Sequence, residues 1–412
     1  MIRILKEYTR PEAKSAGKAL IDTVSEILAD VKANGDDALN KYELKFTGKE
    51  QPLRVSDEEI SEGLKAVGKE YIEALERSAE NIREFHAKQV IKGFMISPRE
   101  GIITGEKVIP LDRVGIYVPG GKASYPSTVL MNVIPAKTAG CKEILIASPS
   151  ITPEILAASK VSGATGIYRM GGAQAIGAFA YGTESVPKVD KITGPGNVYV
   201  AEAKRQVFGA VDIDMIAGPS EILIIADETA NPKYIASDML AQSEHDENAS
   251  AILATTSEKL AHEVQGEIER QISELTRHDI ARASIDNNGA IILVPTIDDA
   301  INFANEYAPE HLEICVKKAF DYAESVRNAG SVFIGEYSPE ALGDYYAGCN
   351  HTLPTMGTAK FSSPLSVLDF VKTSQYIYYS REELMSVSGD IEKIANSEGL
   401  TGHARSIAVR RK

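Results

Sequence analysis

The sequence predicts an α/β protein built on two parallel sheets in tandem. Two series of short apolar runs alternate with helical segments, one beginning near residue 112 and the other near residue 221. Strands that alternate with helices form parallel sheets, because each helix carries the chain back to the start of the next strand. Parallel strands of this kind are apolar along their whole length, so we expect helices on both faces of each sheet.

The N-terminal segment, residues 1–110, is predicted to be mainly helical and polar and to lead into the second α/β domain. Apolar residues recur at three- and four-residue spacing over 11–33 and 71–88, with charged residues between them. This spacing is typical of amphipathic helices. The Asn34-Gly35-Asp36 sequence is expected to end the first of them.

The first α/β domain is expected to span residues 111–219. Its predicted strands are residues 113–118, 143–147, 166–169 and 189–192. Its predicted helices are residues 124–139, 153–162, 173–181 and 197–208.

The second α/β domain is expected to span residues 220–368. Its predicted strands are residues 221–226, 251–254, 290–294, 312–316 and 331–334. Helices are expected between them, including 232–244 and 258–277. Residues 369–412 are predicted to be a short mixed tail that ends in basic residues.

Composition excludes several classes of protein. With 44 Lys and Arg against 58 Asp and Glu, the formal charge of −14 argues against nucleic acid or an anionic membrane as a partner. Cys141, Cys315 and Cys349 are widely spaced and form no CxxC, which argues for a reducing compartment rather than a disulfide framework. We find no signal peptide and no transmembrane span, so we expect a cytoplasmic protein.

Glycine-rich turns lie at the ends of several predicted strands, at 119–121, 171–173, 194–196 and 218–219. Ligands bind beyond the carboxyl ends of strands in open α/β sheets, so these turns favour a nucleotide or another small ligand. None of them is a GxGxxG fingerprint. Three polar residues accompany the turns. Tyr117 could stack on a base or fill a gap, Gln174 could bond a ribose or amide, and Asn197 could do the same or cap a helix.

The seven histidines fall into two groups. His86, His262 and His278 lie in charged helical stretches and are expected to be solvated. The other four lie among polar residues that suit a metal or acid–base site: His245, His311, His351 and His403.

The surroundings of these four residues suggest chemistry. Gln242 and His245 are three residues apart and share a helix face, so both could point at one ion. Glu310 and His311 are adjacent before a strand, where they could act as base and acid on one substrate. A carboxylate also precedes each remaining histidine, in the pairs Asp344 with His351 and Glu398 with His403. Two histidines and a carboxylate from separate elements can form a zinc or manganese site, although each residue taken singly could equally be structural.

Several blocks of the sequence resemble the histidinol dehydrogenase family. They include IDMIAGPSEILIIAD at 213–227, MLAQSEHD at 239–246, NEYAPEHLEI at 305–314, GDYYAGCNHTLPT at 343–355 and EGLTGHARSI at 398–407. The resemblance implies two incomplete Rossmann-like domains with small N- and C-terminal segments. It also implies a homodimer with composite active sites that oxidises L-histidinol to L-histidine, through bound L-histidinaldehyde, with two NAD and one zinc ion per subunit.

The resemblance also implies a role for individual residues. The implied zinc ligands are Gln242, His245, Asp344 and His403, the last supplied by the neighbouring subunit, on which the tail would dock. The implied acid–base pair is Glu310 and His311. The implied substrate contacts are Ser220, Glu398, His311 and the four metal ligands, with His351 nearby. The implied NAD contacts are Tyr117, Gln174 and Asn197.

Two other functions are compatible with these motifs. One is an NAD-dependent dehydrogenase of the same fold that acts on another small polar alcohol, and the other is a non-catalytic zinc- or nucleotide-binding protein. The presence of Glu310 and His311 together with all four metal positions argues against a non-catalytic binding protein. The combination of Ser220 with Glu398 and His403 argues against a dehydrogenase of another alcohol.

Overall fold

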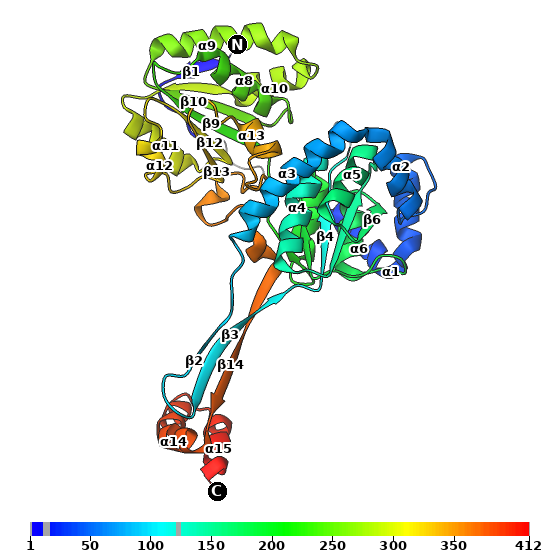
Figure 1. Cartoon of the computed structure of the whole chain (residues 1–412), viewed down its shortest axis with the longest axis vertical. Coiled ribbons are helices and arrows are strands. Elements are labelled where there is room, and N and C mark those ends of the chain that lie inside the picture. The colour runs from blue at the N-terminus through cyan, green and yellow to red at the C-terminus, as the bar shows by residue number, and fades with distance from the viewer. Residues whose placement is uncertain (1, 11–16, 121–124, 412) are drawn as a thin grey trace. The chain divides into compact units, whose positions relative to one another are not determined.

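Two parallel sheets carry most of the chain in the computed structural model, which describes residues 2–10, 17–120 and 125–411 (Figure 1). The chain divides into two units. Unit 1 comprises the residues up to Gln89 together with Leu111–Phe370, and unit 2 comprises Val90–Pro110 and the residues from Val371 onward. Both parallel sheets lie in unit 1, so the predicted α/β class is confirmed.

The first sheet has the strand order β6-β5-β4-β7-β8. Its strands are β4 (Arg113–Tyr117), β5 (Glu143–Ser148), β6 (Gly166–Arg169), β7 (Lys191–Thr193) and β8 (Asp212–Ile213). Successive side chains of a strand point to opposite faces, and β5 shows this directly. Leu145 and Ala147 join one apolar cluster, whereas Ile144 and Ile146 join another.

Helices therefore cover both faces of the first sheet. One cluster contains side chains of α1 (Lys18–Thr47), α6 (Gly172–Tyr181) and α7 (Val198–Val207). The other contains side chains of α2 (Asp57–Val67), α3 (Lys69–Ala87), α4 (Pro126–Ala139) and α5 (Pro153–Ser162).

The second sheet has the order β1-β11-β10-β9-β12-β13. Its strands are β1 (Arg3–Leu5), β9 (Glu221–Ala226), β10 (Ser250–Thr255), β11 (Ala290–Leu293), β12 (His311–Cys315) and β13 (Ser331–Ile334). All six residues of β9 are buried, as expected of a central parallel strand. One face carries α8 (Pro232–Ser243), α9 (Glu258–Gln271) and α10 (His278–Asn288), and the other carries α11 (Ile297–Tyr307). Two short helices, α12 (Phe320–Ala323) and α13 (Glu340–Tyr345), complete this half.

The two sheets share one topology. In each, three successive strands run outward to one edge, and the fourth and fifth lie on the other side of the first strand. This is the 3-2-1-4-5 order of an incomplete Rossmann fold, with β1 added to the second sheet. The point of reversal lies between β4 and β7 in the first sheet and between β9 and β12 in the second.

Unit 2 is an antiparallel sheet with two helices. The sheet has the order β14-β3-β2, in which β14 (Val371–Tyr379) pairs along its whole length with β3 (Ile102–Pro110), and β2 (Phe94–Ile96) pairs with the other edge of β3. The helices are α14 (Arg381–Ser397) and α15 (Thr401–Ala408). The sequence indicated only a mixed tail, because the pairing joins segments that are more than 260 residues apart.

Two other details differ from the prediction. The first helix begins at Lys18 and continues to Thr47, and Gly35, with φ 50° and ψ −128°, kinks it instead of ending it. Residues 11–16 of that predicted helix lie outside the described residues. β1 was not predicted because an isolated three-residue strand has no periodicity to detect, and it exists through its pairing with β11.

The prediction for His86 was wrong. Its side chain is fully buried, and its Nδ1 lies 2.7 Å from Gln89 Oε1, while Nε2 lies 3.4 Å from Asn350 Nδ2. Burial lowers the pKa of His86 because the charged imidazolium is poorly solvated there. His262 and His278 are exposed, as predicted.

Among the described residues, no helix combines the length and the apolar character that crossing a lipid bilayer requires.

Gly194→Ala should destabilise the first sheet. Gly194 follows β7 with φ 104°, and an added Cβ would lie 3.0 Å from the Tyr117 carbonyl carbon, which is backbone and cannot rotate away. We expect a loss of about 2 kcal/mol in the free energy of unfolding, measured by urea denaturation. Gly266→Ala in α9 is the control, because a Cβ there meets no atom within 4 Å. Gly266→Ala should raise the free energy of unfolding by about 0.5–1 kcal/mol. Equal stability of the two variants would mean that the turn after β7 accommodates a side chain without strain.

Candidate functional site

A group of potential metal ligands lies where α8 ends beside α13. The side chains of His245, Glu340 and Asp344 each offer a ligand atom, and these atoms all lie within 4.8 Å of one another. His245 follows the end of α8, whereas Glu340 and Asp344 are one turn apart on α13. One imidazole and two carboxylates form a donor set that fits zinc or manganese.

Gln242 contacts this cluster. The end of its side chain lies between the Glu340 carboxylate and the Glu221 N–H. With the nitrogen toward Glu340, the amide donates at 2.6 Å and its oxygen accepts from the Glu221 N–H at 3.1 Å. In the opposite orientation the oxygen faces the cluster, where it could bind an ion.

Glu340 was not among the predicted site residues. It is 3% exposed, and burial raises its pKa well above the usual range. Its spacing of four residues from Asp344 was the available signal, but that spacing is informative only if residues 340–345 are known to be helical.

His311 lies at the start of β12 with one nitrogen in use. Its Nδ1 lies 3.0 Å from the Glu221 carbonyl oxygen, to which an Nδ1–H can donate. Its Nε2 then carries the lone pair; this atom is buried and has no hydrogen-bond partner among the described residues. Burial lowers the pKa of His311 to about 4, so the imidazole is neutral near pH 7 and able to accept a proton.

Glu310, like His311, is hydrogen-bonded to the main chain of Glu221. Its Oε2 accepts from the Glu221 N–H at 2.8 Å, and the Ser220 hydroxyl also hydrogen-bonds to it. Complete burial raises the pKa of Glu310 well above its usual range, so its carboxylate is a stronger base than an exposed one. The structure thus brings Ser220, Glu310 and His311 together at the amino ends of β9 and β12.

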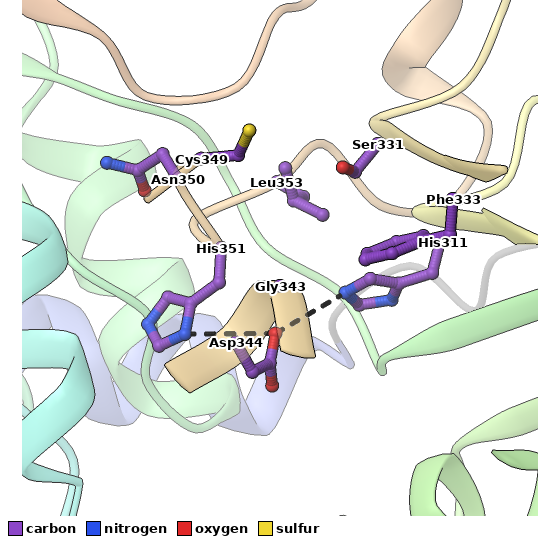
Figure 2. A pocket seen from close by; sticks show the side chains of 9 residues that line it. All are labelled: His311, Ser331, Phe333, Gly343, Asp344, Cys349, Asn350, His351 and Leu353. Atoms are coloured by element: carbon purple, nitrogen blue, oxygen red, sulfur yellow. Dashed lines mark ion pairs between the residues drawn. The ribbon is translucent and has the colours of Figure 1, made fainter. Parts of the chain in front are cut away.

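A small pocket adjoins His311 and Asp344 (Figure 2). Figure 2 shows Asp344 between two imidazoles, with Oδ1 at 3.9 Å from both His311 Nε2 and His351 Nδ1. His351 Nδ1 is also buried without a hydrogen-bond partner among the described residues, and burial lowers the pKa of His351. The pocket is lined by His311, Ser331, Phe333, Gly343, Asp344, Cys349, Asn350, His351 and Leu353.

The remaining predicted ligands are in the other unit. Glu398 follows the end of α14 and His403 lies in α15, and both side chains are exposed. Both residues belong to unit 2, so the cluster in unit 1 is built without them.

The predicted nucleotide residues lie at the carboxyl edge of the first sheet. Tyr117 ends β4 and Asn197 follows β7, so they flank the point of reversal, where α/β sheets bind ligands. The exposed Asn197 caps α7, accepting from the N–H groups of Tyr199 at 3.0 Å and Val200 at 3.2 Å. The ring of Tyr117 is only 3% exposed and packs in the core, which corresponds to the gap-filling alternative.

Gln174 lies in the first turn of α6 and is 2% exposed. Its Nε2 donates to a carboxylate oxygen of Glu43 at 3.1 Å. The Tyr117 hydroxyl accepts from the Gly172 N–H at 3.0 Å, so two of the three predicted residues contact one turn.

Known proteins match this chain over nearly its whole length. A family model described as histidinol dehydrogenase matches residues 9–411. A histidinol dehydrogenase of Bacillus cereus (strain ATCC 10987 / NRS 248) is 55% identical over 392 residues, which cover 94% of this chain and 91% of the relative. One from Clostridium acetobutylicum is 53% identical over 397 residues, covering 95% and 92%.

A solved structure agrees with the fold. The crystal structure of histidinol dehydrogenase from Elizabethkingia anophelis is 38% identical, covers 99% of this chain and 98% of its own, and superposes with a TM-score of 0.93. The chain therefore belongs to the histidinol dehydrogenase family, a family of oxidoreductases.

Proposed function

We propose that this chain oxidises L-histidinol to L-histidine through bound L-histidinaldehyde, the last step of histidine biosynthesis, with zinc and NAD as cofactors. The observation that supports it most is the pairing of Glu310 with His311, both buried and both bound to Glu221, beside the carboxylate of Asp344. A base next to a metal-binding cluster is what oxidation of a coordinated alcohol requires.

His311 acts as the base on the alcohol. Its unpartnered Nε2 takes the hydroxyl proton, because the bond from Nδ1 to Glu221 leaves Nε2 as the only free acceptor of the ring. Its low pKa keeps the imidazole neutral before the step. NAD, when bound, accepts the hydride in each of the two oxidations.

Glu310 acts in the second oxidation. As a carboxylate it takes a proton from water, and the hydroxide so formed adds to the aldehyde to give the anion of a gem-diol. The Ser220 hydroxyl and the Glu221 N–H hold the carboxylate in place. Keeping the aldehyde in a buried site prevents loss of a reactive intermediate.

The two cofactors would be held by residues of the two α/β halves. Zinc would be held by Gln242, His245 and Asp344, together with His403 of a second subunit. It would orient the substrate through the amine and imidazole nitrogens. NAD would lie at the carboxyl edge of the first sheet, near Tyr117, Gln174 and Asn197.

The stoichiometry of NADH distinguishes this function from oxidation of another alcohol. We expect two NADH for each L-histidinol consumed by the zinc-loaded protein. No NADH from L-histidinol with zinc bound would reject the proposal.

Gln242→Ala and Asp344→Ala should each lower zinc affinity and activity together, because each removes an oxygen donor from the site. Zinc content after dialysis against a weak chelator measures this, and we expect a fall of about 10-fold or more in affinity. His262→Ala is the control, since that histidine is exposed on α9 and should retain full zinc. Full zinc occupancy in both test variants would mean that neither residue is a ligand.

Glu310→Gln should abolish oxidation of added histidinal while NAD still binds, because the amide cannot accept the proton of water. NADH formation from histidinal and calorimetric titration with NAD give the two measurements. If histidinal oxidation continues near the wild-type rate, another group activates the water.

The surface of unit 2 supports a dimer. One face of its sheet exposes apolar side chains, with Phe94 57%, Ile96 52% and Ile377 74% exposed. Apolar surface of this extent commonly marks a protein interface. We propose that a second copy supplies its own His403 and Glu398 to the site of the first, so that two-fold symmetry creates two equal composite sites.

Complementation tests the composite site. His403→Ala and His311→Ala should each be inactive alone, but heterodimers of the two variants have one complete site. Mixed after dissociation and reassociation, they should regain about a quarter of wild-type activity, since half of the dimers carry one good site of two. No recovery despite measured subunit exchange would mean that His403 acts within its own chain.

A further inference from the structure

Glu43 lies beside two of the predicted nucleotide residues and has no part in the chemistry above. It is on α1, partly buried, and its Oε1 accepts two hydrogen bonds. One comes from the Gly171 N–H at 3.0 Å and the other from Gln174 Nε2 at 3.1 Å. A single carboxylate oxygen therefore contacts both the glycine turn after β6 and the side chain that follows it.

Glu43 and Tyr117 accept hydrogen bonds from two main-chain N–H groups at the start of α6. The Gly171 N–H donates to Glu43 and the Gly172 N–H donates to the Tyr117 hydroxyl, at 3.0 Å in both cases. Free N–H groups at such a helix start can bind phosphate. Here they are already satisfied, and the carboxylate would repel an anion. These two N–H groups are therefore not open to a phosphate, and the side chain of Gln174 is the predicted nucleotide contact beside them.

The orientation of the Gln174 amide depends on Glu43. Because an amide is planar, the bond at Nε2 also determines where Oε1 lies. Oε1 lies over Gly172, where an added Cβ would be 2.8 Å from it, so the side chain is confined on that side as well. Without Glu43, the amide would have to be ordered when the ligand binds, at a cost in affinity.

We propose that Glu43 is a positioning residue of the nucleotide subsite, which holds the Gln174 amide and the Gly171–Gly172 turn in the arrangement that receives NAD. This proposal rests on the proposed dependence of the enzyme on NAD.

The same pair of helices supplies a matched control. Asp36, also on α1, accepts from Thr183 Oγ1 at 2.5 Å and from the Ser185 N–H at 3.3 Å. These contacts are made beyond the other end of α6, away from the Gly171–Gly172 turn. Asp36 thus joins α1 to the segment that follows the same helix, and these contacts involve no predicted nucleotide residue.

Calorimetric titration of the zinc-loaded protein with NAD tests the role of Glu43. Glu43→Ala should raise the Kd for NAD about 10-fold, because it removes both hydrogen bonds. Glu43→Gln should stay within about twofold of wild type, since one amide oxygen can accept both bonds. Asp36→Ala should lower the melting temperature but leave the Kd for NAD unchanged. Zinc content should be the same in all variants.

Four results would overturn the proposal. Wild-type NAD affinity in folded Glu43→Ala would make Glu43 a structural residue only. Equal loss of NAD affinity in Glu43→Ala and Asp36→Ala would indicate general destabilisation of α1 on α6. A Glu43→Gln variant as weak as Glu43→Ala would show that hydrogen bonding by the oxygen is not what matters. If wild-type protein binds no NAD, the proposed function itself fails, and this role fails with it.

Discussion

The main-chain groups of Glu221 hold both predicted acid–base residues. Its N–H donates to Glu310 at 2.8 Å and its carbonyl oxygen lies 3.0 Å from His311 Nδ1. Because these groups belong to the first residue of a buried central strand, they cannot move without disturbing the sheet. The side chain of Glu221 is paired with Arg10, which offsets the cost of burying its charge. Rigid placement of this kind is what proton transfer demands of its groups.

The metal cluster depends on a second anchor in the same sheet. Glu313, two residues after His311 on β12, accepts from the Glu340 N–H at 2.8 Å, at the first residue of α13. This bond ties the helix that carries Glu340 and Asp344 to the strand that carries His311. Burial raises the pKa of Glu313 well above its usual range, and that of nearby Asp238 to about 6. Buried carboxyls of this kind are tolerated because they share protons and hydrogen bonds.

The local pattern of apolar residues was sufficient to predict the strands of the two parallel sheets, but not the antiparallel sheet of unit 2. The run Glu221–Ala226 is almost wholly apolar, as a short strand buried on both faces requires, so the predicted limits of β9 agree with the observed ones. β3 and β14 were missed because they are stabilised by each other across the length of the chain. His86 was misassigned for the same reason: its helix is polar in sequence, and only packing against residues such as Asn350 buries it.

The sequence by itself determined the fold class, the residues of its central strands and, through the family resemblance, the candidate site. Those features depend on side-chain type and on spacing along the chain, which the sequence states directly. Only the tertiary structure decided which nitrogen of His311 is free, that Glu340 joins His245 and Asp344, and that Glu43 holds Gln174. Each of these depends on distances between elements far apart in sequence, and such distances are set by how the helices pack on the sheets.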